Sequence, residues 1–242
     1  MKRATVGVIG GVGPAATAEF LTRVIAHTDA QRDQDHADLV VFQHSSIPDR
    51  TAFLVGESDD DPSPVLAADA TILASLGVAA IVLPCNTASA FIATVRAAVT
   101  IPVVDIVFAA VEDAQARGWS RIGVLSTMGT RMAGAYVHAI EHRGLSIVHP
   151  SEPSQALLNT LIYDQVKAGR PPQRELLDAV LAEIFAGGAD GVILGCTELS
   201  VAAALWEPRE RVIDSLDSLA IRTVTLAGCH LAVPVAAEPA AP

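Results

Sequence analysis

Two cysteines follow apolar runs in the same pattern. Cys85 lies in "IVLPCNTASA" at residues 81–90, and Cys196 lies in "VILGCTELS" at residues 192–200. In each run the polar residues behind the cysteine open a helix-like segment. A helix N-terminus favours a thiolate over a thiol, so both side chains are candidates for acid/base chemistry.

Paired thiols predict inversion of a stereocentre. A thiolate on one face of a carbon removes a proton, and a thiol on the other face returns one. A lone cysteine at a strand end is more often a small buried hydrophobe. Cys229, in "LAGCHLAV", has no counterpart in the pattern, and we assign it that structural role.

The elements that would position these cysteines alternate between strand and helix. Short β-branched runs predict strands at Thr5–Ile9, Leu39–Phe42, Ala80–Leu83, Val103–Val104, Arg121–Leu125, Ser146–Val148, Gly191–Leu194 and Arg211–Ile213. Helical patterns occur near residues 15–28, 64–76, 87–98, 106–117, 131–143, 154–168, 173–187, 198–204 and 215–227. This alternation indicates parallel sheets with right-handed crossovers.

An internal repeat organises these elements. "TVGVIGGVGPAAT" at the start resembles "RIGVLSTMGTRMA" in the middle, and each is followed by its cysteine strand at a similar distance. We therefore expect an α/β fold of two similar half-domains related by pseudo-two-fold symmetry, each a four-stranded parallel sheet flanked by helices. Ligands bind at the carboxyl edges of such sheets. Facing edges would place Cys85 and Cys196 on opposite walls of one cleft.

The expected boundaries follow from the repeat. Residues 1–104 plus 211–232 form the first half-domain, and residues 105–210 form the second. The Ala/Pro-rich residues 233–242 are expected to be a disordered tail.

Composition narrows the class of partner. The 242 residues carry a net charge of −11 without a basic cluster, which argues against nucleic acid or an anionic membrane as partner. No apolar run reaches the length of a membrane span. Three cysteines without short-range pairing fit a reducing compartment, and we expect a cytoplasmic protein.

We expect neither a cofactor nor a metal. The only lysines are Lys2 and Lys167, which argues against a pyridoxal-phosphate enzyme. Residues 11–16 fit a relaxed dinucleotide fingerprint, but the next strand ends without an acidic residue for the ribose. Residues 138–142, "HAIEH", match a zinc pattern that lacks a clear third ligand. These alternatives stay open beside that of a non-catalytic ligand sensor.

A small amino diacid would need local cations in so acidic a chain. Arg50, in a Pro-Asp-Arg turn, suits a carboxylate because a guanidinium binds it bidentately. Its alternative is a surface ion pair with Asp49. Lys167, two residues before Gly169, is a second candidate, and its alternative is an ordinary partner of a helix C-terminus.

The α-carboxylate of such a substrate would be held at the helix starts. Asn86, Thr87 and Thr197 offer side chains and backbone N–H groups there. Thr127 and Thr130, in the second-half turn "STMGT", are further candidates. Polarising this carboxylate would stabilise a carbanion-like transition state.

Five segments together resemble one family. "GGVGPAAT", "IPDRT", "PCNTA", "IYDQVKAG" and "GCTEL" occur in the order and spacing of the cofactor-independent aspartate racemases, within the aspartate/glutamate racemase family, over about residues 5–226. The resemblance implies that Cys85 and Cys196 are the acid/base pair. It also implies that Arg50 and Lys167 bind the side-chain carboxylate of aspartate, which would be interconverted between its L and D forms.

The remaining motif positions refine this resemblance. Glu198 is typical of the aspartate branch, since glutamate racemases usually carry histidine there, and Gly11 joins the substrate-binding set. Ser89 and Val12 depart from the family, which usually has histidine and methionine at these positions. The resemblance further implies a homodimer. Racemases or isomerases of other small amino acids or diacids remain the alternative.

Overall fold

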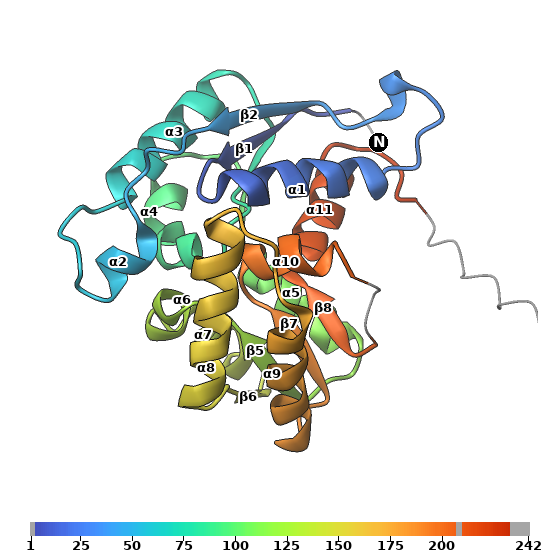
Figure 1. Cartoon of the computed structure of the whole chain (residues 1–242). Helices are drawn as coiled ribbons and strands as arrows, with labels where there is room; N and C mark the ends of the chain where they lie inside the picture. Colours follow the sequence, from blue (N-terminus) through green and yellow to red (C-terminus); the bar gives the residue numbers. More distant parts are fainter. Residues whose placement is uncertain (1–2, 207–209, 233–242) are drawn as a thin grey trace, which may run out of the picture.

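The computed structural model describes residues 3–206 and 210–232. The protein contains two four-stranded parallel sheets (Figure 1). The first sheet has the order β2-β1-β3-β4, and the second has the order β6-β5-β7-β8. The strands are β1 (Val6–Gly10), β2 (Leu39–Gln43), β3 (Ala80–Val82), β4 (Val103–Val104), β5 (Arg121–Leu125), β6 (Ser146–Val148), β7 (Gly191–Leu194) and β8 (Val212–Asp214). The identical order in both sheets confirms the predicted fold class.

The sequence of the central strands reflects their burial on both faces. All five residues of β1 are buried, and β5 is buried from its second residue onward. Parallel sheets are covered by helices on both sides, so their strands are continuously apolar rather than alternating. The central strands β1 and β5 each lead into a turn at the carboxyl edge of their sheet.

The helices fall close to the expected segments, except for α2, where no helix was expected. They are α1 (Pro14–Ala26), α2 (Arg50–Leu54), α3 (Ser63–Ser75), α4 (Ile92–Ala97), α5 (Ile106–Ala116), α6 (Met128–Met132), α7 (Ala135–Glu141), α8 (Glu152–Asn159), α9 (Arg174–Ala186), α10 (Thr197–Ala203) and α11 (Ser215–Leu226). The 3₁₀ turns η1 (Asp33–Asp35) and η2 (Thr87–Phe91) and the π-helix η3 (Thr160–Lys167) complete the chain. No helix among the described residues is both long and apolar enough to cross a membrane.

Three expected helices are interrupted in the structure. The segment 87–98 begins as the 3₁₀ turn η2 before α4, and the segment 154–168 changes from α8 into a π-helix. The segment 131–143 begins earlier, at α6, and breaks at Gly134, whose φ is 67°. Interruptions of this kind are common at functional sites.

Two helices cross between the sheets. Helix α5 follows β4 of the first sheet but packs against α7, β7 and β8, whereas α11 follows β8 and packs against α1 and β3. In Figure 1, α10 and α11 lie between the first sheet above and the second sheet below. One buried cluster includes Val8 of β1 and Val124 of β5, so the two sheets share part of their core.

The expected boundary at residue 211 is wrong for strand β8. Val212 pairs with Val192, so the strand belongs to the second sheet and not to the first half-domain. A run of β-branched residues does not reveal which strand it pairs with, because pairing is decided by long-range packing. The rest of the division stays a prediction, and residues 233–242 lie outside the described residues.

Candidate active site

Both motif cysteines are buried at the carboxyl edges of their sheets. Cys85 follows β3, and its backbone N–H donates to the carbonyl of Leu83. Cys196 follows β7 and is the N-cap residue of α10. The two side chains line the same narrow cavity of about 10 Å³. The structure thus brings them together, as the repeat predicts.

The carboxyl ends of strands from both sheets line this cavity. Its wall consists of Val12, Asp49, Arg50, Thr51, Cys85, Asn86, Thr87, Thr127, Lys167, Cys196, Thr197 and Glu198. Sequence reasoning missed Thr51 as a lining residue, although it belongs to the "PDRT" motif. The Thr130 hydroxyl is hydrogen-bonded to the hydroxyls of Thr87 and Thr127, which belong to this wall.

The Cys196 thiol lies beside the carboxylate of Glu198, which in turn lies beside the ammonium group of Lys167. The Cys196 thiol donates to Glu198 Oε2 over 3.1 Å, and Lys167 Nζ lies 3.6 Å from Glu198 Oε1. Burial raises the pKa of the Cys196 thiol well above its usual value, and the negative charge of Glu198 adds to this effect. Cys196 is therefore a thiol near neutral pH.

Lys167 stays charged in this surrounding. Burial alone would lower its pKa, but the negative charge of Glu198 is the largest of the opposing effects, and the pKa of Lys167 lies above its usual value. The side chain is 32% exposed, and its Nζ lies 5.2 Å from the centre of the Tyr163 ring. An accessible cation therefore stands beside the cavity.

Arg50 presents an unsatisfied edge of its guanidinium group. The residue is 8% exposed, and its Nη1 donates to the carbonyls of Ile47 and Pro48. Its buried Nε has no hydrogen-bond partner. Asp49 forms no ion pair with Arg50 and instead caps α2 by accepting from Ala52 N. An arginine held by one nitrogen and unpaired at another suits an incoming anion.

Three threonine hydroxyls join the two halves at the cavity. Thr87 Oγ1 lies 3.1 Å from Thr127 Oγ1 and 2.8 Å from Thr130 Oγ1, and the latter two lie 3.0 Å apart. Thr127 also caps α6. The triangle therefore has hydroxyl protons that can be redirected to a ligand oxygen. Thr197, by contrast, donates weakly to Glu198 over 3.5 Å.

The Asn86 side chain is already occupied on two sides. Its Oδ1 accepts from Tyr136 Oη over 2.7 Å, and its Nδ2 donates to Ser215 Oγ over 2.9 Å. Only the second Nδ2 hydrogen and the backbone N–H remain for a substrate. Sequence reasoning missed both partners, because each comes from an element distant in the chain.

Ser89 is buried and is not among the residues that line the cavity of the cysteines. Its hydroxyl donates to Asp105 Oδ1 over 2.7 Å, and Asp105 caps α5. Ser200, at the equivalent distance after Cys196, donates to Asp214, which caps α11. The departure of Ser89 from the family motif therefore has a structural counterpart in the second half.

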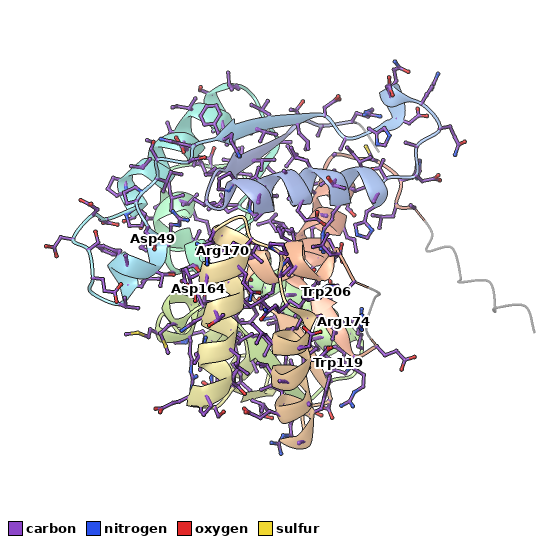
Figure 2. The ribbon with its side chains drawn as sticks, in the orientation of Figure 1. Asp49, Trp119, Asp164, Arg170, Arg174 and Trp206 are labelled. Atoms are coloured by element: carbon purple, nitrogen blue, oxygen red, sulfur yellow. The ribbon has the colours of Figure 1, made fainter. Side chains whose placement is uncertain are left out.

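A wider cavity adjoins the narrow one. It has a volume of about 400 Å³, and the two share Asp49, Arg50, Lys167 and Glu198. Gly11 lies in this outer cavity rather than beside the cysteines. In Figure 2, Asp49 at the start of α2 lies on the same side of the molecule as Asp164 of η3 and Arg170, which follows η3.

The zinc pattern finds no support in the geometry. His138 and Glu141 lie on α7 with His142 at its end. Within residues 3–206 and 210–232, no three His, Cys, Asp or Glu side chains are grouped so that they could hold a metal ion. Beside the dinucleotide-like turn, Gly13 lies close to the Glu198 carboxylate, which would repel a phosphate.

Two parallel sheets that present one buried cysteine each to a common cavity define an α/β isomerase scaffold. Comparison with known proteins agrees with this class. Residues 9–223 match the Asp/Glu/Hydantoin racemase family. The chain belongs to this racemase family.

Individual relatives carry different substrates in their names. The structure of an aspartate racemase from Picrophilus torridus is similar with a TM-score of 0.81 and 27% identity, over 95% of this chain and 96% of that one. The broad specificity amino-acid racemase RacX of Bacillus subtilis (strain 168) is 26% identical, over 91% of this chain and 96% of its own length. A glutamate racemase from Corynebacterium glutamicum is 34% identical, over 52% of this chain and 45% of its own length.

Proposed function

We propose that the protein interconverts the L and D forms of aspartate or a close amino diacid without a cofactor. Cys85 and Cys196 would act as the paired base and acid. The observation that carries this proposal is that both thiols line one cavity whose wall also includes Arg50, a cation whose buried Nε has no hydrogen-bond partner.

One proton moves from the substrate to one sulfur, and a different proton moves from the other sulfur to the substrate. With Cys85 as thiolate, its Sγ takes the α-proton, and the C–H electron pair is left on the carbanion-like α-carbon. Cys196 then gives its thiol proton to the opposite face, and the new C–H bond forms as the S–H bond breaks. In the reverse direction Cys196 must first lose its proton, and Glu198 is positioned to accept it at 3.1 Å.

The distal carboxylate would bind between the two cations. Arg50 has an Nε without a partner, and Lys167 has an ammonium group that lies 3.6 Å from Glu198 and has three donors. The threonine triangle and the free Asn86 N–H would hold the α-carboxylate, where negative charge grows in the transition state. We further propose a homodimer in a reducing compartment such as the cytoplasm, which the three free thiols fit.

A second candidate is a racemase with a broader range of amino acids. The outer cavity of about 400 Å³ favours it, because aspartate needs only a small part of such a space. Ile47, Pro14 and Val166 line this cavity and would contact an apolar side chain.

Chiral chromatography of single enantiomers of the common amino acids, after incubation with the protein, decides between these functions. Racemisation of aspartate above all others supports the first function, and comparable rates for uncharged amino acids support the second. No racemisation of any of them would leave a binding role and contradict the proposal. Light scattering in solution tests the dimer.

A further inference from the structure

A chain of buried hydrogen bonds connects the two cysteine loops. Tyr136 Oη contacts Asn86 Oδ1 over 2.7 Å, and Asn86 Nδ2 contacts Ser215 Oγ over 2.9 Å. Ser215 Oγ in turn contacts the carbonyl of Leu194 over 2.7 Å. This series of hydrogen bonds therefore connects Asn86, the residue after Cys85, with Leu194, two residues before Cys196.

The direction of this chain is determined by its last member. The carbonyl of Leu194 can only accept, so the Ser215 hydroxyl must donate to it. Ser215 then accepts from Asn86, which requires the Nδ2 side of the amide. Asn86 Oδ1 faces Tyr136, so the tyrosine hydroxyl must donate. Burial raises the pKa of Tyr136 well above its usual value, so the hydroxyl keeps its proton.

Tyr136 also packs against the second cysteine loop. The tyrosine belongs to α7 and is 3% exposed. A Cβ atom placed on Gly195 would lie 2.8 Å from the ring carbon Cε2 of Tyr136, closer than side chains approach one another. Gly195, directly before Cys196, is therefore the residue that allows the ring to lie under this loop. One side chain thus contacts the neighbour of each cysteine.

We infer that Tyr136 and Ser215 are positioning residues, which hold the Asn86 amide so that its second N–H faces the cavity between Cys85 and Cys196. This inference rests on the proposed function. The amide cannot rotate without breaking bonds at both ends. Its N–H is thus oriented before the substrate arrives, and the α-carboxylate gains a donor that needs no reorganisation.

The first test is a double-mutant cycle on racemisation of the substrate found by the chiral screen. Tyr136→Phe removes only the hydroxyl, and we expect a roughly tenfold fall in kcat with a smaller change in KM. In the Asn86→Ala background, Tyr136→Phe should have no further effect, because its partner is gone. Equal losses in both backgrounds would mean that the tyrosine acts through packing, and the inference would be wrong.

Ser215→Ala tests the other end of the chain. It should lower kcat in the wild type but not in the Asn86→Ala background. Ser218→Ala is its matched control, because Ser218 is also buried on the same helix but is not a member of the series Tyr136–Asn86–Ser215–Leu194. We expect its kcat to equal that of the wild type. A loss in Ser218→Ala as large as that in Ser215→Ala would contradict the inference.

A second measurement is independent of activity. The side-chain amide signals of Asn86 in NMR spectra can be assigned by their absence from Asn86→Ala. Their hydrogen exchange should be slow in the wild type and at least tenfold faster in Tyr136→Phe. Equal exchange rates would overturn the inference even in an active enzyme. Faster exchange in a protein that racemises no amino acid would instead overturn the proposed function alone.

Discussion

At the scale of single residues, the two cysteines occupy equivalent positions with different neighbours. Two residues after Cys85 stands Thr87, whereas two residues after Cys196 stands Glu198. The Glu198 carboxylate contacts the second thiol at 3.1 Å, whereas a residue with a neutral hydroxyl occupies the equivalent sequence position after the first. Because a negative charge opposes ionisation of a neighbouring thiol, the site has a built-in difference between its acid and its base.

Removal of either motif cysteine should abolish most of the racemisation. Each direction of turnover needs one sulfur as base and the other as acid, so Cys85→Ala and Cys196→Ala should each lose about 10²–10⁴-fold in kcat. The double variant should be little worse than either single one. Cys229→Ala, a buried cysteine outside the cavity, is the control and should stay active. A folded Cys196→Ala variant with the wild-type rate would eliminate the two-thiol mechanism.

Glu198→Gln should make Cys196 easier to ionise. The carboxylate raises the pKa of this thiol, so its removal should lower that pKa, whereas Lys167→Met should raise it. The rate of alkylation by iodoacetamide as a function of pH, in a Cys85→Ala/Cys229→Ala background, reports the thiolate. Its midpoint should move to lower pH in Glu198→Gln and to higher pH in Lys167→Met. Midpoints that move the other way would contradict the charge assignment.

Arg50→Ala should lower kcat/KM selectively for acidic substrates. Loss of a charge-assisted hydrogen bond costs roughly 1.5–3 kcal/mol, which corresponds to about a 10- to 100-fold lower kcat/KM for aspartate. The comparison with alanine as substrate is the control, because loosening of the Ile47–Pro48 turn would affect both amino acids. Equal losses for aspartate and alanine would remove Arg50 from the binding of the distal carboxylate.

At the scale of elements, each cysteine-bearing segment is tied to the crossing helix of its own sheet. Ser89 donates to Asp105 at the start of α5, and Ser200 donates to Asp214 at the start of α11. Each aspartate also accepts from the backbone two residues further on. A serine four residues after each cysteine therefore anchors the site to the helices that join the halves.

Ser89→Ala should destabilise the fold. The substitution leaves the buried Asp105 with one donor fewer, which corresponds to about 1–3 kcal/mol in the free energy of unfolding. Urea denaturation measures this loss. Ser58→Ala, whose hydroxyl accepts a bond in an exposed loop, is the control and should change stability by less than about 0.5 kcal/mol. Similar values for both variants would remove the anchoring role of Ser89.

At the scale of the whole molecule, a charged cluster joins α1 to the second half. Arg23 of α1 lies 2.7 Å from Asp214 and 3.0 Å from Asp217, and its Nη2 donates to the carbonyl of Ser200. Burial raises the pKa of the Asp214 carboxyl, although the charge of Arg23 opposes this. The arginine therefore compensates a buried carboxylate at the junction of the two sheets.

Arg23→Met should cost about 3–5 kcal/mol of unfolding free energy at pH 7, because it leaves Asp214 buried without its partner. A raised folded-state pKa means that the folded state prefers the protonated carboxyl. The contribution of the Asp214 carboxyl to stability is then present at low pH and is lost as pH rises through that pKa. The deficit in urea denaturation should accordingly shrink between pH 7 and pH 5. Arg32→Met, in an exposed pair, is the control. A deficit that grows on acidification would contradict the assignment.

The sequence by itself determined the succession of strands and helices and the two cysteine motifs. Apolar strand patterns and small-residue turns are local, and a repeated pattern implies a repeated topology. Arg50 and Lys167 were predicted as the cations that an amino diacid needs in so acidic a chain, and the resemblance to the aspartate racemases added Glu198; all three line the cavity.

Only the tertiary structure decided what these residues contact. It assigned β8 to the second sheet, turned Ser89 toward Asp105 and placed Asn86 between Tyr136 and Ser215. The two Asn86 contacts join residues 50 and 129 positions apart in the chain. The contact of Ser89 and the pairing of β8 each depend on how neighbouring elements pack. Local patterns cannot specify such partners, because the free energy that selects them comes from burial and hydrogen bonding of the assembled core.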